Sequence, residues 1–456
     1  MIRSLESNLF DWFKKAKRKP MVIRGARQVG KSTLVRNFAK SQNLDLLEIN
    51  LERNIDLDSM FEGKKTDLIL KELEAICKKT IGPNSLLFLD EIQATPFALP
   101  CLRYFYEDYP NLPIITAGSL LEFTLANHNY SMPVGRIEYL HLNVMSFKEF
   151  LQALDEDYLL SVIDNFSFDQ SVPSKAHKLL LNKQREYLFT GGMPEAVLIY
   201  KETKSFAKCR EVHRSIIETY QDDFPKYSKY SQASLVHKIF NSIPQLIGKK
   251  VKYSHITKDE PSYKLKLIID LFIKARLLLP AYHSDCSGIP LKTQANDKIY
   301  KLYFLDIGLL NYMLGLDWRA ISNIDERKLV NEGMLAEQFI AQHLAYNKLG
   351  LEQPELYYWI REGKSLNAEV DFVISCNQNT IPIEVKAGKS GTLKSLQQFI
   401  LSKKASKAIR FDLNPPSSQE VSHQLRQKEK LEAAKFKLIS LPCYLIEELE
   451  KCSVPL

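Results

Sequence analysis

The stretch "PMVIRGARQVGKSTLVRNFAK", residues 20–40, contains a short apolar run, a loop with two glycines and a helix-forming segment. The apolar run predicts a buried strand, and the segment after the loop predicts a helix. Between them, the spacing Gly25-x-x-x-x-Gly30-Lys31-Ser32 meets the pattern of a phosphate-binding loop in full. A strand before this motif and a helix after it are the context that the motif requires, so the stretch predicts an α/β nucleotide-binding core.

Each part of this loop has a chemical task. Gly25 and Gly30 let backbone N–H groups turn toward phosphate oxygens, and the helix N-terminus adds the positive end of its dipole. Lys31 is expected to reach the β- and γ-phosphates, and the Ser32 hydroxyl to bind Mg²⁺.

An acidic motif follows a second apolar run, in "SLLFLDEIQ", residues 85–93. An apolar run without alternation predicts a strand that is covered on both faces. Ligands of open α/β sheets bind at the carboxyl ends of the strands. Asp90 is therefore expected to hold Mg²⁺, and Glu91 to polarise the attacking water. Together with the loop, this motif predicts a nucleotide site that binds Mg²⁺.

A third predicted strand, in "LPIITAGSLLEF", ends at Thr116 and Ser119. Either hydroxyl is placed to orient water beside the γ-phosphate, and Ser119 also suits the N-cap of a following helix. Arg136 comes next, in a turn preceded by glycine. It has two interpretations of similar weight: stabilising charge on the transferred phosphoryl group, or an ordinary surface salt bridge.

Length and composition limit the remaining choices. A chain of 456 residues predicts about three domains, and 45% hydrophobic with 25% charged residues is typical of a folded protein. The net charge of +8 permits DNA as a partner without requiring it. The seven cysteines form no CxxC pair, which favours a reducing compartment. Charged residues interrupt the most apolar segment, so we expect a cytoplasmic protein with no membrane partner.

Five segments resemble successive landmarks of bacterial and archaeal AAA-type ATPases that carry a C-terminal DUF4143 domain. They are "RGARQVGKSTL", "FLDEIQ", "AGSLLEF", "VGRIEYLHLNVMSFKEFL" and "FTGGMPEAV". The resemblance implies ATP binding at Gly25–Thr33, including Thr33, with Asp90 and Glu91 as the Walker B pair. This sequence departs from the family at Ala117, where the pattern is often a direct Thr-Gly-Ser.

The middle of the chain is predicted to be helical, with a lid up to residue 203 and a small unit after it. In residues 204–325, two segments with helical spacing are followed by a strand, a loop and a strand. This order predicts a winged-helix arrangement, in which lysines of the second helix and of the wing would contact DNA: Lys264, Lys266, Lys292 and Lys298. The alternative is an interdomain spacer with solvated lysines.

Near the C-terminus, "AEVDFVISCNQNTIPIEVKAG", residues 368–388, predicts an antiparallel hairpin. Alternation puts Glu369 and Asp371 on one face of the first strand, and Glu384 and Lys386 on one face of the second. An ordinary surface hairpin with one charged face has the same pattern. A proline, Pro382, restricts the second strand to a sheet edge or to an irregular start.

An amphipathic helix upstream carries Glu337, and a helix downstream offers Gln397. Helix–strand–strand–helix with Asp371 and Glu384-x-Lys386 resembles the PD-(D/E)xK nuclease superfamily. Asp371 and Glu384 would hold Mg²⁺ together with Glu337, the metal would activate water, and Lys386 would orient the nucleophile.

The sequence therefore predicts an α/β protein in three parts. They are a P-loop AAA-type ATPase with a lid (1–203), a winged-helix-like unit (204–325) and a restriction-endonuclease-like domain (326–456). One hypothesis is a Mg²⁺-dependent ATPase that acts on nucleic acid, with Asp371, Glu384 and Lys386 as its nuclease site. The other is a nucleotide-dependent switch, with or without oligomerisation, whose C-terminal domain only binds a partner.

Overall fold

The computed structural model describes most of the chain. The described residues are 1–54, 57–63, 65–119, 133, 135–169, 171–227, 233–316, 318, 332–346, 350, 355–362, 367–376, 378–386, 388, 393–427 and 430–453. The chain forms two compact units. Unit 1 comprises 1–144, 274–277 and 348–353, and unit 2 comprises 145–273, 278–347 and 354–456. The predicted boundary at residue 325 lies outside the described residues.

Unit 1 is built on a five-stranded sheet with the order β2-β3-β4-β1-β5, in which every neighbouring pair is parallel. Its strands are β1 (Met21–Arg24), β2 (Asp45–Asn50), β3 (Ser85–Asp90), β4 (Ile114–Gly118) and β5 (Glu138–His141). All residues of β3 and β4 are buried. The prediction that the apolar run at residues 86–89 is a strand covered on both faces is therefore confirmed.

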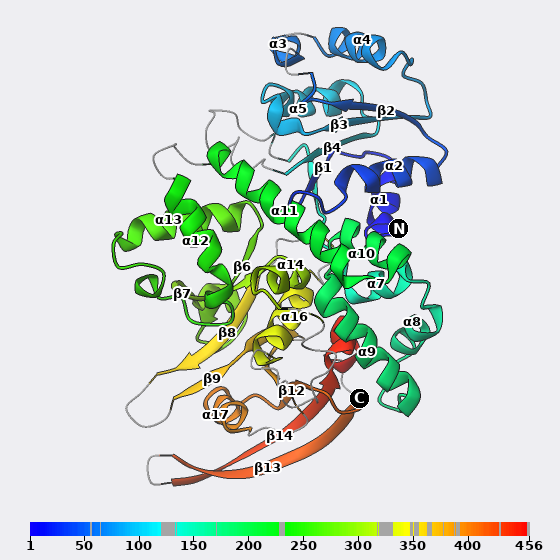
Figure 1. The fold of residues 1–456 in the computed structure, drawn as a ribbon. Coiled ribbons are helices and arrows are strands. Elements are labelled where there is room, and N and C mark those ends of the chain that lie inside the picture. The colour runs from blue at the N-terminus through cyan, green and yellow to red at the C-terminus, as the bar shows by residue number, and fades with distance from the viewer. Residues whose placement is uncertain are drawn as a thin grey trace. The chain divides into compact units, whose positions relative to one another are not determined.

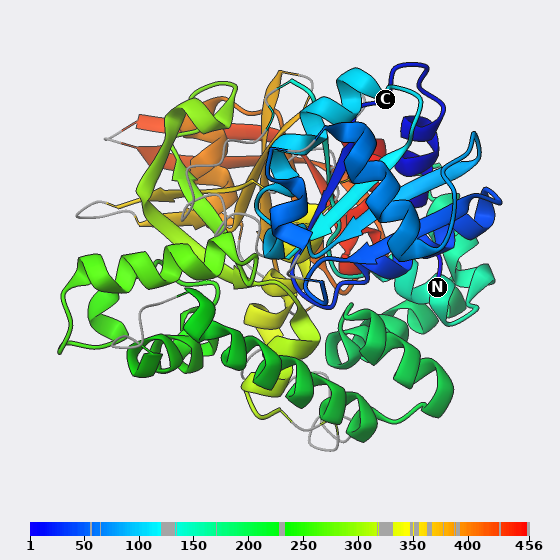
Figure 2. The same cartoon turned by 90° about the horizontal axis from the view of Figure 1, so that it is seen from above.

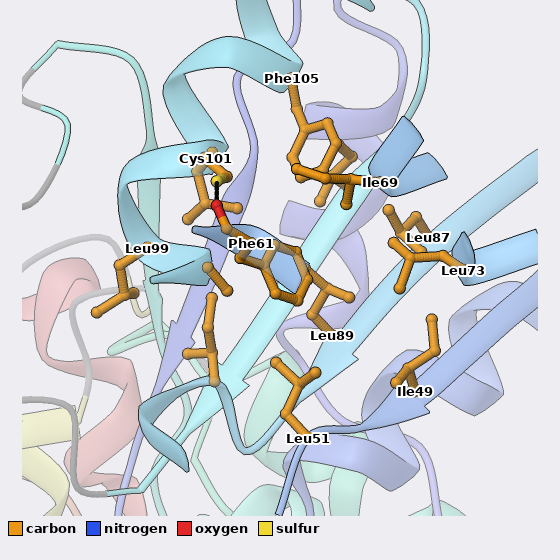
Figure 3. Close-up of a cluster of buried hydrophobic side chains, with 14 of the residues drawn as sticks. Ile49, Leu51, Phe61, Ile69, Leu73, Leu87, Leu89, Leu99, Cys101 and Phe105 are labelled. Atoms are coloured by element: carbon orange, nitrogen blue, oxygen red, sulfur yellow. Dashed lines mark hydrogen bonds between the residues drawn. The ribbon is translucent and has the colours of Figure 1, made fainter. Parts of the chain in front are cut away.

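Helices cover both faces of this sheet (Figure 1). They are α1 (Glu6–Phe13), α2 (Lys31–Ser41), α3 (Asp58–Phe61), α4 (Thr66–Cys77) and α5 (Ala98–Asp108). Helices α3, α4 and α5 form the main core of unit 1 with β2 and β3. Figure 3 shows Phe61, Ile69 and Phe105 of these helices above Leu87 and Leu89 of β3. This packing fixes β3, and with it the position of the acidic pair at its carboxyl end.

The helices of unit 2 are mostly longer. They are α7 (Phe147–Ala153), α8 (Asp157–Asp164), α9 (Ser174–Thr190), α10 (Pro194–Thr203), α11 (Phe206–Tyr227), α12 (Ala233–Leu246), α13 (Ser262–Lys274), α14 (Ile307–Met313), α16 (Glu332–Tyr346), α17 (Lys394–Lys403) and α18 (Leu449–Ser453). At the Gly-Gly-Met-Pro segment, one helix ends at Thr190 and the next begins at Pro194, with the proline in the first turn. None of the described helices is long and apolar enough to cross a bilayer.

Two mixed sheets complete unit 2, with the orders β7-β6-β8-β9 and β10-β11-β12-β14-β13. Their strands are β6 (Leu278–Ser284), β7 (Ala295–Phe304), β8 (Leu356–Arg361), β9 (Ala368–Val370), β10 (Phe372–Cys376), β11 (Asn379–Val385), β12 (Lys407–Asp412), β13 (Ser417–Gln427) and β14 (Lys430–Pro442). Strands β13 and β14 form a long hairpin, seen side by side in Figures 1 and 2. Helix α17 packs against strands of both sheets. Its Phe399 lies edge-on to Trp359 of β8, with 5.3 Å between the ring centroids.

The predicted C-terminal hairpin is present, but its first strand is divided. Strand β9 pairs with β8 in one sheet, whereas β10 pairs with β11 in the other. The chain passes between the two sheets at Asp371, the single residue that separates β9 from β10. Glu369 and Asp371 therefore do not lie on one face of a single strand, as simple alternation predicted.

Strand β11 is an inner strand, paired with β10 on one side and β12 on the other. The expectation of an edge strand from Pro382 is therefore wrong. Pairing with β12 begins only at Ile383, one residue after Pro382. The other expectation, an irregular start, agrees with this register, because the proline precedes the ladder on that side.

The middle region has the predicted order of two helices, α12 and α13, followed by a β-hairpin, β6 and β7. Strand β6 also pairs in parallel with β8 through Ala281↔Leu356 and Tyr282↔Tyr357. One sheet thus contains strands from both sides of the predicted boundary at residue 325. The division into three domains, and the winged-helix assignment, stay predictions.

Two glycines of unit 2 are required by close packing. A Cβ on Gly191 would lie 2.2 Å from Asp306 Oδ1, and a Cβ on Gly192 would lie 2.1 Å from the Met145 carbonyl oxygen. Asp306 caps α14 through the Leu309 N–H at 2.9 Å and also accepts from the Gly192 N–H at 2.6 Å. The turn before α10 is therefore joined to the start of α14 with no room for a side chain.

We expect Gly192→Ala to destabilise unit 2 by about 1–3 kcal/mol, because the neighbouring atom is a backbone oxygen that cannot move aside cheaply. Gly333→Ala is the control, since its Cβ would meet open space in the first turn of α16. Scanning calorimetry should show a lower Tm for the first variant and an unchanged or higher Tm for the second. Equal Tm values for both variants would contradict this account of the turn.

Candidate nucleotide site and carboxylate cluster

The phosphate-binding loop lies between β1 and α2, as predicted. Gln28 and Gly30 adopt the left-handed conformation, with φ of 64° and 91°. These turns fold the loop around the buried side chain of Lys31, whose Nζ donates to the carbonyl oxygens of Gly25 at 3.2 Å and Ala26 at 2.8 Å. The loop therefore places its lysine at the start of a helix, where phosphate binds favourably.

Gly25 has a packing role that the motif alone does not reveal. A Cβ at this position would lie 2.2 Å from the carbonyl oxygen of Leu142, just after β5. The residue after β1 must therefore be glycine because the chain following β5 passes directly against it. The backbone of Leu142 also donates to the Arg24 carbonyl oxygen at 2.8 Å, which holds the two segments together.

Ser32 and Asp90 meet across the sheet edge. The Ser32 hydroxyl donates to Asp90 Oδ2 at 2.6 Å. Asp90 is buried, and burial raises the pKa of its carboxyl group. A hydroxyl and a carboxylate in contact beside a phosphate-binding lysine are the oxygen ligands that Mg²⁺ prefers. The residues present thus fit the Mg²⁺ that the motif implies.

Glu91 leaves the strand in a left-handed conformation with φ of 53°. This conformation, unusual for glutamate, turns the chain sharply after Asp90. The side-chain amide of Gln93 donates to the Glu91 carboxylate and orients it. Its predicted role in polarising water stays a prediction.

The two candidate sensor hydroxyls are both buried. Thr116 lies in β4 opposite Leu89 of β3, and Ser119 follows the end of that strand. Within the described part of the chain, neither hydroxyl has a hydrogen-bond partner. Buried hydroxyls without partners are uncommon in proteins, which suits groups that bind a ligand or its water. The helix that Ser119 would cap falls outside the described residues.

Arg136 lies at the surface. Its guanidinium donates to Glu107 Oε1 at 3.1 Å, and its side chain is 44% exposed. This is the salt bridge of the second interpretation. A role in stabilising the phosphoryl group stays a prediction.

Sequence reasoning missed Arg276, which it treated only as a charge that interrupts an apolar segment. Residues 274–277 belong to unit 1, and Arg276 adopts a left-handed φ of 60° there. Burial lowers the pKa of Lys31 to about 8, and the positive charges of Arg27 and then Arg276 contribute to this lowering. Burial, then Arg276, lowers the pKa of His141 to about 3. No sequence motif marks this arginine, because it follows the loop by some 245 residues.

The C-terminal acidic residues gather where the two sheets of unit 2 meet. Asp371 accepts from the Val385 N–H at 2.8 Å, so its side chain spans from the end of β9 to β11. Glu384 is buried in β11 and forms an ion pair with Lys386. Burial, then the charge of Asp371, raises the pKa of Glu384. The surface-hairpin interpretation is therefore wrong, because Glu384 lies inside the domain.

Glu337 lies beside the same residues and has two partners that sequence reasoning missed. Tyr303 donates to Glu337 Oε2 at 3.2 Å, and Lys301 Nζ lies 3.9 Å from the same oxygen. Both partners are in β7. Burial, then the charge of Asp371, raises the pKa of Glu337. Among the described residues, no group of three acidic, histidine or cysteine side chains is placed to hold a metal ion.

The lysines predicted to contact DNA include two that are paired with carboxylates. Lys264 donates to Glu260 at 3.0 Å, and Lys292 forms an ion pair with Glu355. The predicted Gln397 is buried in α17.

Comparison with known families agrees with this geometry. Residues 17–151 match the family described as "AAA domain". The N-terminal region carries an AAA domain. Residues 181–320 and 332–444 match two domains of unknown function, DUF8612 and DUF4143. The nucleotide-site residues from Gly25 to Arg136 all lie inside the AAA match, whereas the carboxylate cluster lies in the DUF4143 match.

Solved structures similar to this chain include Caenorhabditis elegans PCH-2, at 12% identity and a TM-score of 0.27, covering 45% of this chain and 63% of that one. Another is the Thermotoga maritima RuvB Holliday junction branch migration motor, at 15% identity and a TM-score of 0.28, covering 60% and 88%. The chain thus spans less than two thirds of PCH-2. A comparison with curated proteins gave no match.

We expect Arg276→Gln to weaken ATP binding by a factor of about 5 to 10 at low salt, because it removes a positive charge near Lys31. Calorimetric titration with a non-hydrolysable ATP analogue measures this change, which should shrink as salt is added. Arg103→Gln is the control, since Arg103 is an exposed residue of α5 paired with Glu107. Equal affinities for the two variants would show that Arg276 does not act on the nucleotide.

Proposed function

We propose that the protein binds and hydrolyses ATP with Mg²⁺ in its AAA domain, and that nucleotide turnover acts as a switch for a C-terminal region that binds a partner. The observation that carries this proposal is the contact of Ser32 with Asp90 at 2.6 Å beside the buried Lys31. These three groups come from one loop and a non-adjacent strand, and they supply the lysine and the oxygen ligands that MgATP needs.

The residues of the AAA domain have separate tasks in this proposal. The loop from Gly25 to Thr33 and the ammonium group of Lys31 hold the phosphates, and Ser32 with Asp90 would hold Mg²⁺. The metal would neutralise phosphate charge when it is bound. Glu91, held by the amide of Gln93, orients and polarises the attacking water. Thr116 or Ser119 completes the site as a hydroxyl that senses the γ-phosphate.

Two substitutions test the ATPase. Lys31→Ala should abolish ATP binding and turnover, whereas Glu91→Gln should keep binding and lower kcat by about 100-fold. Lys40→Ala is the control, because Lys40 is an exposed lysine of the same helix. A coupled phosphate-release assay and nucleotide titration measure both properties. Turnover that survives Lys31→Ala would refute the proposed site.

A second candidate function is cleavage of nucleic acid at the C-terminal cluster. Asp371, Glu384, Lys386 and Glu337 favour it, because they lie in one partly buried region and resemble the pattern of the nuclease superfamily. Two observations favour the switch over the nuclease. Lys301 forms an ion pair with Glu369 of this cluster. Among the described residues, no group of three acidic, histidine or cysteine side chains is placed to hold a metal ion.

Incubation with single- and double-stranded DNA in Mg²⁺ or Mn²⁺ separates the two functions. The switch predicts intact DNA, with the wild type and Asp371→Asn giving the same result at every nucleotide state. Cleavage by the wild type that Asp371→Asn abolishes would establish the nuclease instead. Asp371→Asn is chosen because it keeps an oxygen that can accept from the Val385 N–H.

A further inference from the structure

Lys301 is a buried cation that no sequence motif predicts. It lies in β7 opposite Ala281 of β6, and its side chain is 1% exposed. A lysine ammonium group loses its hydration at such a position, which costs several kcal/mol unless anions replace the water. The surroundings of this side chain therefore decide what it does.

Carboxylates supply this replacement. Lys301 Nζ forms an ion pair with Glu369 of β9, and lies 3.9 Å from Glu337 Oε2 of α16. The negative charges of Glu337, Asp371 and Glu369 all act on it and raise its pKa against the effect of burial. The ring of Tyr358 in β8 lies 5.2 Å from the ammonium group and adds a cation–π contact. The ammonium group is therefore held by side chains from three elements, β8, β9 and α16.

The ammonium group of Lys301 in turn stabilises the acidic side chains around it. Glu337, Glu369, Asp371 and Glu384 bring four carboxyl groups to one region, against two ammonium groups, Lys301 and Lys386. Glu384 keeps one buried oxygen that has no hydrogen-bond partner in the described part of the chain. Without Lys301, the cluster would hold its acidic groups close together with a single positive charge beside Glu384.

We propose that Lys301 is the permanent counter-cation of this cluster, so that an ammonium group of the chain takes the part that a divalent metal ion plays in the nucleases which this region resembles. The residues present do not fit a metal, because each carboxyl group already has a partner in the chain. Lys301 faces Glu337 and Glu369. Asp371 accepts from the Val385 N–H, and Glu384 pairs with Lys386. The cluster then serves as a buried ionic joint between β7, in the DUF8612 match, and the DUF4143 match. This inference rests on the proposed function, in which the C-terminal region binds and does not cut.

The first test uses the intact protein without nucleotide and counts bound Mn²⁺ by electron paramagnetic resonance. The wild type and Asp371→Asn should bind the same number of ions, because the cluster takes none. One additional ion in the wild type that is lost in Asp371→Asn would overturn the proposal. Any binding by Ser32 and Asp90 is common to both proteins and cancels in the comparison.

The second test removes the ammonium group with Lys301→Met, which keeps the length of the side chain. Its Tm should fall by roughly 5–10 °C, and Mn²⁺ should recover part of this loss. Lys435→Met is the control, an exposed lysine of β14 in the same unit. A Tm for Lys301→Met equal to that of the control would overturn the proposal. If Lys301→Met does not fold, the proposal is decided by the first test, which compares the Mn²⁺ bound by the wild type and by Asp371→Asn.

These readouts separate the inference from the function on which it rests. DNA cleavage that depends on Asp371 would refute both. A lost Mn²⁺ ion without DNA cleavage would refute the inference and leave the switch intact. ATP turnover of Lys435→Met should equal that of the wild type, because the substitution removes only an exposed charge of unit 2.

Discussion

Parallel pairing in the order β3-β4-β1 decides where the chemistry of unit 1 collects. The three strands run in one direction, so their carboxyl ends reach the same edge of the sheet. Strand β1 supplies the phosphate loop, β3 supplies Asp90 and Glu91, and β4 supplies Thr116. Because β4 lies between the other two, the loop and the acidic pair are separated by one strand. The contact of Ser32 with Asp90 spans that width.

Much of this edge could be predicted from the sequence. The phosphate loop is a local pattern, since its lysine and serine follow the strand within a few residues, and burial of β3 follows from an apolar run without alternation. Arg276 could not be predicted in the same way. Its charge acts on Lys31 from a short segment, 274–277, that belongs to unit 1 although the chain before it belongs to unit 2. Neither the spacing nor the composition of the sequence indicates this placement.

The C-terminal cluster shows a second limit of pattern reasoning. Alternation assumes a single sheet, and here the chain changes sheets at Asp371. The sequence singled out Glu337, Asp371, Glu384 and Lys386 as one group, but it offered no reason to add Lys301 and Tyr303 from a strand some 70 residues earlier. The charge balance of a buried region depends on all the elements that meet there. Lys301 could therefore be identified as the partner of these carboxyl groups only from the structure.

The parallel pair of β6 and β8 has a consequence for dividing the chain. The two strands are neighbours in one sheet but come from regions that match different families. A protein shortened at either side of residue 325 would therefore present an open row of backbone N–H and C=O groups along β6 or β8. Such an unprotected edge is a template for adding strands from other molecules. The DUF8612 and DUF4143 regions thus protect each other's strand edges from aggregation, and each is expected to need the other to stay soluble.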